Sequence, residues 1–556
     1  MNYKARIGSG LFFILFTVGL FGQQEEVRVV KPYSPTLSGA EKMQLLPSLN
    51  EEIDYEMPEF SYDLFQKRYD TEFKITPIVA ARMMQMPLKK LYKSYLKAGM
   101  GNYLTPYAEL NVNQLRSRKG TMGVTLRHHS MNGKVKLDNG EKVPGGFSDN
   151  YGAFYGSRFF KNSVVQYQAG ASYNTAVHYG IDPALDTSFA RKDLVHPYFT
   201  GFASLGMQST HADTFHLDYN GTLQYHYFTH DFNETEHGIR FNMDMNKSLR
   251  VLDLAGELGF SYFGHVPEWD TVLAKHMVFK INPWIAKSAK DWKFVAGFNS
   301  YFEVQNGTMT PHFYPKARFE FNIVEEVIVP YFGVDGYLES NNYRTVAEDN
   351  PYINPGLSVK PTSHKLIAFA GLKGRFSDAV SWNIAGQYAI IDNQYFYVND
   401  TSSILKNQFS VIYDDLTLLN LKGEFTVRPS DSWKIFLKGN YYSYSMVRED
   451  YAWHKPDFDA NLQVRYNMSE KFIIDGGIFF IGPRYFKNID IGGAIPVITS
   501  DKLPATFDLN LGVEYRYSTL LSFWVKLNNA AAQKYYHYSQ YPSFRFRFMA
   551  GFSYAL

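Results

Sequence analysis

Residues 544–556, at the end of the chain, read FRFRFMAGFSYAL. Aromatic or small apolar residues occupy every second position from Phe544 to Leu556, and arginine, methionine, glycine, serine and alanine stand between them. Successive side chains of a β-strand point to opposite faces, so this pattern predicts a strand with one apolar and one largely polar face. The chain therefore ends in an amphipathic strand.

The same alternation runs back along the sequence to about residue 95. It is clearest in the segments 312–323, 457–466 and 507–517. A β-sandwich also alternates, so the period alone does not identify the fold. Three further features favour a transmembrane barrel: full charges on the polar faces, strands of about ten residues or more, and Tyr and Phe gathered near strand ends.

The connections between these segments fall into two classes. Short polar turns, such as 117–120 and 468–470, alternate with longer loops, such as 131–148, 340–358 and 486–503. Outer-membrane barrels have short periplasmic turns and long outside loops. The alternation predicts an all-β fold, a transmembrane antiparallel β-barrel of about 22 strands over residues 95–556. An even strand number places both termini in the periplasm of a bacterium, with the barrel in the outer membrane.

Composition excludes several other classes of protein. The 556 residues include no Cys and carry a formal net charge of +2. A disulfide scaffold, a thiolate metal site and a cysteine nucleophile are excluded, and so is a basic nucleic-acid binder. A mean hydropathy of −0.28, with no long apolar run beyond the N-terminus, excludes a bundle of membrane helices. Outer-membrane lipids are the expected surroundings, and nucleic acid is not an expected partner.

The N-terminal part differs from the rest of the chain. Lys4 and Arg6 precede the apolar run Leu11–Phe21, and Gly22 follows it. This order predicts a secretory signal peptide over residues 1–22. Residues 23–94 contain many prolines, which break helices and central strands, and they are predicted to form an extended segment rather than a globular domain.

The last two hairpins resemble those of TonB-dependent receptors. The residues that carry this resemblance are Asp508–Tyr517, Phe523–Asn528, Lys534–Tyr538, Tyr541-Pro542 and the final strand. The final strand is also similar to the signal that the barrel-assembly machinery reads during insertion. In this chain that signal would comprise Phe548, Phe552, Tyr554 and Leu556. The resemblance implies a 22-stranded receptor barrel that takes up a solute, with the assembly machinery as a partner.

The N-terminus departs from that family. Its receptors carry a folded plug of well over a hundred residues before the barrel, and residues 23–94 could form at most a remnant of one. A stretch near its start resembles the family's TonB-binding segment, with acidic residues before β-branched ones that could add a strand to TonB. It comprises Glu25, Glu26, Val27, Arg28, Val29 and Val30. A Val-rich coil without a partner is the alternative interpretation.

An open lumen of this size would be a leak, so something must obstruct it. The N-terminal segment, inward-folded loops and a partner protein are the three candidates. The residues predicted to line the lumen carry charges of both signs and therefore name no substrate. They are Lys316, Arg318, Glu320, Asp457, Asp459, Arg465, Glu514, Arg516, Arg545 and Arg547.

The sequence contains no motif typical of a catalytic site. Walker loops, dinucleotide fingerprints, nucleophile elbows and zinc-protease motifs are all missing from it. His230, Glu234 and His237 could bind a metal ion in one predicted outside loop, although such loops are more often simply solvated. We therefore predict a non-enzyme without a cofactor or a resident metal.

Two functional hypotheses remain. In the first, the barrel transports a solute through its lumen. In the second, a barrel that has lost its plug is a scaffold in an outer-membrane complex. TonB, a surface lipoprotein or another subunit of such a complex are the candidate partners.

Overall fold

The computed structural model describes residues 92–556, with gaps at 116, 183–188, 212–215, 233, 268–273, 306, 325, 401–404 and 491–496. The predicted signal peptide, the proline-rich segment and the TonB-like stretch lie outside the described residues. The first twelve strands are β1 Ser94–Gly101, β2 Thr105–Asn113, β3 Gly120–Lys136, β4 Lys142–Phe159, β5 Ser163–Val177, β6 Val195–Ser209, β7 Asp218–His230, β8 Thr235–Ser248, β9 Asp253–Val266, β10 Ala274–Ser288, β11 Trp292–Gln305 and β12 Thr308–Phe321. The others are β13 Val329–Glu339, β14 Thr362–Ser377, β15 Val380–Asn399, β16 Phe409–Val427, β17 Trp433–Met446, β18 Phe458–Met468, β19 Phe472–Ile481, β20 Arg484–Asp490, β21 Val497–Leu503, β22 Thr506–Arg516, β23 Leu521–Asn528 and β24 Arg547–Ala555. Two short helices, η2 Arg191–Asp193 and α1 Tyr343–Asp349, lie in connections between strands.

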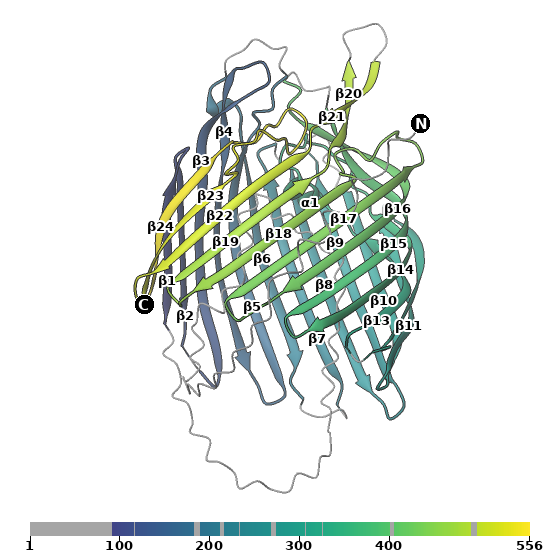
Figure 1. The fold of residues 1–556 in the computed structure, drawn as a ribbon. Helices are drawn as coiled ribbons and strands as arrows, with labels where there is room; N and C mark the ends of the chain where they lie inside the picture. The colour runs from purple at the N-terminus through teal and green to yellow at the C-terminus, as the bar shows by residue number, and fades with distance from the viewer. Residues whose placement is uncertain are drawn as a thin grey trace, which may run out of the picture. The chain divides into compact units, whose positions relative to one another are not determined.

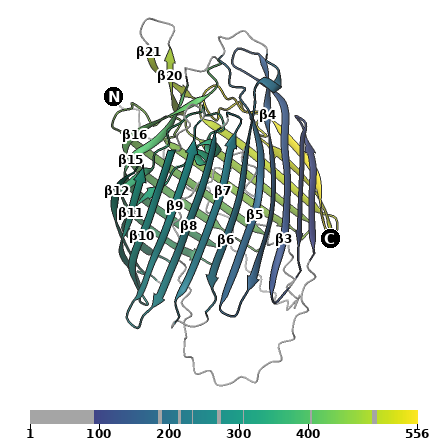
Figure 2. The same cartoon turned by 180° about the vertical axis from the view of Figure 1, so that it is seen from behind.

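Twenty-two of these strands form one antiparallel sheet that closes on itself (Figures 1 and 2). Each strand pairs with the next one along the chain, β19 pairs with β22, and β1 pairs with β24 to complete the ring. The prediction of a 22-stranded antiparallel barrel is confirmed. No helix among the described residues is long and apolar enough to cross a membrane.

The outward face of the barrel is apolar, as the alternation predicted. On β12 the side chain of Phe313 is 65% exposed, and Phe332 on β13 and Leu372 on β14 are about half exposed. Exposing such a continuous apolar surface to water carries a large free-energy cost, whereas contact with lipid chains does not. This belt therefore identifies a membrane-spanning barrel.

Connections at the two ends of the barrel differ in length. At the end where β24 finishes, turns are short, and we call it the short-turn end. The opposite, long-loop end carries the connections 178–194, 340–361, 447–457 and 529–546. Two predicted loops there are largely strand: residues 131–148 extend β3 and β4, and the predicted loop 486–503 contains most of β20 and all of β21, which form a separate hairpin. β3 and β4 continue the hydrogen bonding of the barrel beyond the apolar belt, whereas β20 and β21 pair only with each other, so neither loop needs lipid-facing side chains.

The final strand begins three residues later than its pattern suggests. Phe544, predicted on the same face as Phe548 and Phe552, is only 6% exposed and packs against Tyr103, with ring centroids 5.0 Å apart. The connection 529–546 runs across the barrel mouth before β24 begins, so Phe544 belongs to that connection. Phe548 and Phe552 do face outward.

Candidate functional site

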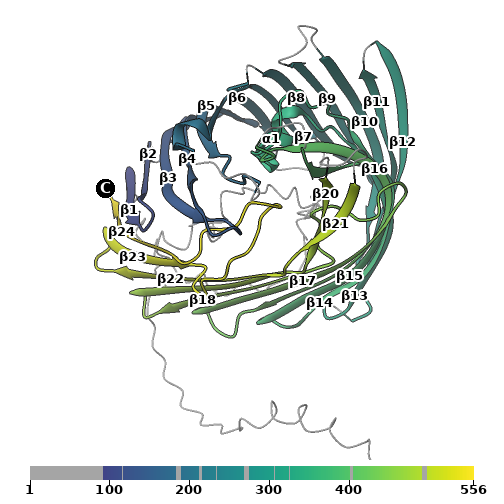
Figure 3. The ribbon, with the colours of Figure 1, turned by 90° about the horizontal axis from the view of Figure 1, so that it is seen from above.

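The long connections pack together inside the long-loop end of the barrel. Seen along the barrel axis, α1 and the connection between β23 and β24 lie within the ring of strands (Figure 3). Their buried apolar side chains form one cluster, which we call the loop cap. Its members are Met131, Val135, Leu137, Val143, Val177, Tyr179, Ile181, Leu194, Phe228, Tyr343, Val346, Ala347, Ile353, Leu357, Tyr397, Phe409, Tyr538, Tyr541 and Phe544.

Tyr541 is the centre of the loop cap. Its side chain is fully buried, and its ring stacks on Tyr352 with the centroids 3.7 Å apart. Tyr179 lies against it at 5.0 Å and donates a hydrogen bond from its hydroxyl to the carbonyl of Pro542 at 3.0 Å. Aromatic pairs of this kind contribute about 1 kcal/mol each beyond the area they bury. Three separate connections are thus held together by rings.

A buried carboxylate ties α1 to the barrel wall. Glu236, at the start of β8, accepts hydrogen bonds from the backbone N–H groups of Tyr343 at 2.7 Å and Arg344 at 3.4 Å. His226 on β7 contacts the same carboxylate at 3.0 Å. Glu236 is almost fully buried, so these bonds replace water around its charge. The first turn of α1 is therefore fixed by a residue more than a hundred positions earlier in the chain.

A second buried carboxylate holds the residues that follow α1. Glu234 accepts a hydrogen bond from the backbone N–H of Gly356, and His265 lies 3.7 Å from its other oxygen. Burial by itself would raise the pKa of Glu234. The Gly356 N–H, His265 and the nearby Tyr343 hydroxyl lower this pKa by more, so the net shift is downward. The group therefore stays ionised, and Glu234 and Glu236 clamp both sides of α1.

The metal site suggested by the sequence does not assemble. Glu234 points inward, whereas His237 lies on the outward face and contacts the hydroxyl of Tyr225 at 2.9 Å. His230 pairs instead with Asp231, at 2.6 Å. Among the described residues there is no group of three or more ligands that could hold a metal ion. Glu234 lies in the turn just before β8, whereas His237 is on β8 itself with its side chain on the outward face.

Asp231 joins two histidines beside the clamp. Its two oxygens lie 2.7 Å from His196 and 2.6 Å from His230. Burial raises the pKa of Asp231, and the two imidazoles lower it far more, so the pKa lies well below its usual range. Asp231 is therefore held in its ionised form between the two imidazoles.

His454 links a further connection to the cap. Its Nδ1 lies 3.0 Å from the carbonyl oxygen of Tyr397, and its Nε2 accepts a hydrogen bond from the backbone N–H of Ser539 at 3.3 Å. These two contacts fit only the neutral imidazole with its proton on Nδ1. Burial, with a smaller contribution from Arg484, lowers the pKa of His454 to about 3.

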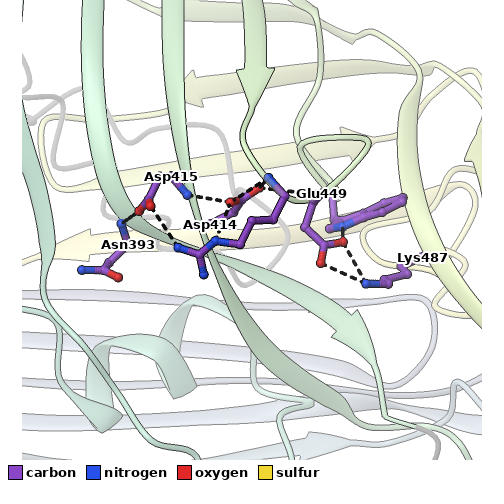
Figure 4. A network of polar contacts seen from close by, with 7 residues as sticks. Asn393, Asp414, Asp415, Glu449 and Lys487 are labelled. Carbon is purple, nitrogen blue, oxygen red and sulfur yellow. Dashed lines mark hydrogen bonds and ion pairs between the residues drawn. The ribbon is translucent and has the colours of Figure 1, made fainter.

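The connection carrying His454 is itself anchored by acidic residues (Figure 4). Asp414 on β16 is fully buried and accepts hydrogen bonds from the backbone N–H groups of Arg448 and Glu449, at 2.9 and 2.8 Å. The carboxylate of Glu449 in turn binds Lys487 on β20 at 2.8 Å and the indole N–H of Trp453 at 2.8 Å. The connection 447–457 therefore joins the barrel wall to the base of the hairpin β20–β21.

Half of the ten charged residues predicted to line the lumen form ion pairs with other described residues. Glu320 on β12 pairs with Arg318 at 2.6 Å and with Lys373 on β14 at 2.9 Å. Arg465 binds Asp475 at 2.6 Å. These side chains occupy the face of each strand opposite the apolar belt.

The remaining residues of that predicted set occupy varied positions. Lys316 lies over the ring of Trp284 at 3.9 Å, Asp459 accepts a hydrogen bond from Asn440 at 2.8 Å, and Glu514 lies 3.9 Å from Arg516. Arg547 is buried at the start of β24. Asp457 and Arg545 are exposed and precede their strands, so neither is part of the strand face it was assigned to.

The residues that hold the cap were not singled out from the sequence. In the sequence, Glu236 and His226 are two further polar residues around the predicted loop of His230, Glu234 and His237, and Asp414 carries no distinguishing pattern. The tyrosines of 534–541 were noticed as a family-like pattern rather than as a core. The partners of all these groups are distant in sequence, which local patterns do not reveal.

The sequence matches no protein-family model and no curated protein, whereas the structure resembles solved outer-membrane proteins. The FrpB iron transporter from Neisseria meningitidis superposes with a TM-score of 0.64 at 9% identity, covering 84% of this chain and 82% of that chain. The pyoverdine outer membrane receptor FpvA from Pseudomonas aeruginosa PAO1 gives 0.62 at 10% identity, with 84% and 79% covered. The ferric-catecholate import receptor Fiu from K12 E. coli gives 0.59 at 10% identity, with 84% and 82% covered. At these identities the likeness concerns the fold, and the chain has the 22-stranded receptor-like barrel that its last two hairpins led us to expect.

Proposed function

We propose that this protein transports a solute across the bacterial outer membrane, with both termini in the periplasm and the loop cap closing the outer mouth. The observation that carries the proposal is the pair of buried carboxylates, Glu234 and Glu236, which fasten α1 inside the ring of strands. The two carboxylates are polar anchors beside the apolar core of the loop cap, so changing them would weaken the closure while leaving that core and the barrel intact. The similarity to receptors and transporters of the same fold supports this function.

The path through the barrel is the second part of the proposal. The inward-facing charges of the strands would line it, and their pairing, as in Arg318 with Glu320 and Arg465 with Asp475, leaves no strong field of one sign. A solute would therefore be selected by hydrogen bonding and shape rather than by its net charge. No catalytic step and no cofactor enter this account.

The two ends of the chain would bind the machinery that inserts the barrel and the protein that supplies energy for uptake. Phe548 and Phe552, on the outward face of β24, with Tyr554 and Leu556, would be read by the barrel-assembly machinery during insertion into lipid. TonB would pull on the stretch Glu25–Val30 by adding a strand to it.

Deleting Glu25–Val30 is expected to abolish energy-dependent uptake while leaving the barrel in the membrane. The deletion removes the strand that TonB would pair with, and it touches no described strand. The measurement compares solutes accumulated in the periplasm by mass spectrometry, with and without a protonophore, in cells producing either protein. Deleting residues 36–41 of the same segment is the matched control. Protonophore-sensitive uptake that survives loss of Glu25–Val30 would exclude TonB coupling at this stretch.

A scaffold role is the second candidate, and the hairpin β20–β21 favours it. This hairpin stands beyond the barrel at the long-loop end (Figure 1), and Ile498 on it is 61% exposed. A scaffold would be recovered with a partner in fixed stoichiometry after gentle detergent extraction, and removing residues 486–501 would release that partner. Recovery of the barrel alone would leave transport as the better account.

A further inference from the structure

The wall of the barrel is split between β12 and β13. β12 pairs with β11 along its whole length, from Thr308 to Phe321, but with β13 only from Ala317 to Glu320. Among the residues that the structure describes, the stretch Met309–Pro315 therefore has a neighbouring strand on one side only. We call the side of this stretch that faces β13 the open edge.

Two prolines account for the split. Asn322, just after β12, donates its backbone N–H to Asp291 on the β11 side, so the even-numbered residues of β12 turn their backbone groups toward β11. The odd-numbered residues turn theirs toward β13. Pro311 and Pro315 are both odd-numbered and have no N–H. Pairing with β11 is therefore undisturbed, while β13 loses two of the donors that it would need.

On the other side of the split, the backbone of β13 already has hydrogen-bond partners. Gly336 would pair with Pro315 if the register of the two strands continued. Its N–H donates instead to the carboxylate of Asp335 at 2.8 Å, and its C=O accepts a hydrogen bond from the side chain of Asn299 on β11 at 2.7 Å. Within the described part of the chain, nothing donates to the carbonyl groups of the open edge.

The open edge lies at the depth of the hydrocarbon. Phe319 of β12 stacks on Trp292 at 6.3 Å and marks the aromatic girdle near the short-turn end. A strand tilted by about 45° rises about 2.4 Å per residue, so the open edge lies roughly 10 to 24 Å above Phe319. Met309 and Phe313 on this stretch are 61% and 65% exposed. Unsatisfied backbone groups are costly in lipid, so a donor from the surroundings is needed at the open edge.

We propose that the open edge binds the headgroup of an amphiphile from the outer leaflet, and that such an amphiphile is the solute, entering the barrel between β12 and β13. The edge presents four carbonyl groups and only two N–H groups, because two of its four residues are proline. A headgroup rich in hydrogen-bond donors, such as a primary ammonium, fits this edge. Its acyl chains would stay in lipid beside Phe313. The inference rests on the proposed function, both for transport and for the orientation.

The lumen side of the split offers further acceptors to the same headgroup. Asp335 lies at the start of the unpaired part of β13. Glu303 on β11 stands opposite Thr310 in the register, and its carboxylate lies 3.3 Å from His276 and 3.0 Å from His312. An ammonium that passed the carbonyl groups of the open edge would thus reach carboxylates.

An amphiphile is favoured over a strand from a partner protein. A strand added to the open edge would need N–H groups from β12 as well as carbonyl groups, and Pro311 and Pro315 supply none. Strand pairing would also require the partner to lie inside the bilayer along β12. A headgroup needs only acceptors, and lipid is always present at this depth.

The first test measures lipid binding by the full-length protein, purified in detergent, stripped of lipid and titrated under native mass spectrometry. Phosphatidylethanolamine and phosphatidylcholine with the same acyl chains differ in one respect that matters here, because only the former has N–H donors in its headgroup. We expect phosphatidylethanolamine to bind at least about tenfold more tightly. The variant Pro311→Val, Pro315→Val, which restores both N–H groups, should lose this preference. Pro283→Val on β10, another strand proline, is the matched control and should bind as the wild type does.

The second test locates the headgroup in nanodiscs of phosphatidylethanolamine treated with a carbodiimide, which couples an amine to a nearby carboxylate. We expect lipid on Asp335 or Glu303 of the wild type and at least about tenfold less on Pro311→Val, Pro315→Val. Glu326, exposed in a turn at the short-turn end, is the internal standard.

Equal affinity for the two lipids, or a preference that survives in Pro311→Val, Pro315→Val, would overturn the proposal. So would lipid on Glu326 alone, or a protein coupled to Glu303 in place of lipid. Uptake that depends on Glu25–Val30, in a protein whose inner carboxylates never couple, would leave transport standing and remove the entry between β12 and β13. Coupling at Asp335 or Glu303 without any uptake would support the headgroup site and exclude transport, so the two failures are distinguishable.

Discussion

Replacing Glu236 with alanine is expected to turn a closed barrel into a conducting one at pH 7. The substitution leaves the N–H groups of Tyr343 and Arg344 without their buried acceptor and removes the partner of His226. Leaving such groups unsatisfied costs about 3 kcal/mol, which raises the open fraction of the cap about a hundredfold. α1 would then leave the ring of strands while the barrel itself stays folded.

The measurement is single-channel conductance of the full-length protein in planar bilayers, with hydrogen exchange of residues 340–356 as a second readout. Glu348→Ala is the matched control, because Glu348 lies on the same helix but is exposed and forms an ion pair with Arg344 one turn away. We expect frequent openings and fast exchange for Glu236→Ala, and neither for Glu348→Ala. Unchanged conductance together with fast exchange would mean that α1 does not close the mouth.

Acidification from pH 7 to pH 5 is expected to loosen the cap through His454. The pKa of this imidazole is about 3 in the folded cap, below its ordinary value, because burial opposes the charge. As the pH falls below about 6.5, the released loop binds a proton and the closed loop does not, so closure loses stability. At pH 5 the loss amounts to about 2 kcal/mol for one such group. Protonation would also remove the acceptor that Nε2 offers to the N–H of Ser539.

The carboxylates of Glu234 and the neighbouring Asp231 act in a different pH range. The pKa values of Asp231 and Glu234 are lowered, so their contribution to closure is complete above the ordinary carboxyl range and is lost only at still lower pH. Between pH 7 and pH 5 the effect therefore belongs to buried histidines.

His454→Gln separates the histidine from other acid effects. A glutamine amide can donate to the carbonyl of Tyr397 and accept from Ser539 without titrating. We expect wild-type conductance to rise between pH 7 and pH 5, and the rise in His454→Gln to be clearly smaller. His178 and His537, whose pKa values are also lowered by burial, should supply what remains. An identical rise in both proteins would exclude His454 as the titrating group.

The barrel could be predicted from sequence because its rule is local. Apolar and polar residues alternate along each strand, because only the apolar face can contact lipid. The regular succession of short and long connections then gives the number of strands. Phe544 shows the limit of this local rule. Its position in the alternation is that of a lipid-facing residue, but the chain at Phe544 still belongs to the connection before β24. The ring is therefore buried beside Tyr103.

The loop cap could not be predicted because its contacts join residues far apart in the sequence, and none of these residues belongs to a recognisable motif. Glu236 meets α1 across 107 positions, and Ser539 meets His454 across 85. From the sequence alone, Glu236 would be expected to be exposed to solvent, because its burial depends on α1, which is formed by a distant part of the chain. The three candidate metal ligands do not meet because each has a different partner in the fold: His230 pairs with Asp231, Glu234 binds Gly356, and His237 contacts Tyr225 on the outward face.

An engineered disulfide across the loop cap, which can be reduced again, tests the central claim most directly. The side chains of Asn399, at the end of β15, and Ser539, in the connection before β24, are hydrogen-bonded to each other. The chain contains no Cys, so Asn399→Cys, Ser539→Cys supplies a single pair of thiols that can form one disulfide. The measurement is single-channel conductance of this variant at pH 5, before and after reduction. The account predicts a silent barrel while the disulfide is intact and wild-type openings once it is reduced. Openings of equal frequency with the disulfide intact would contradict a cap that must move to admit a solute.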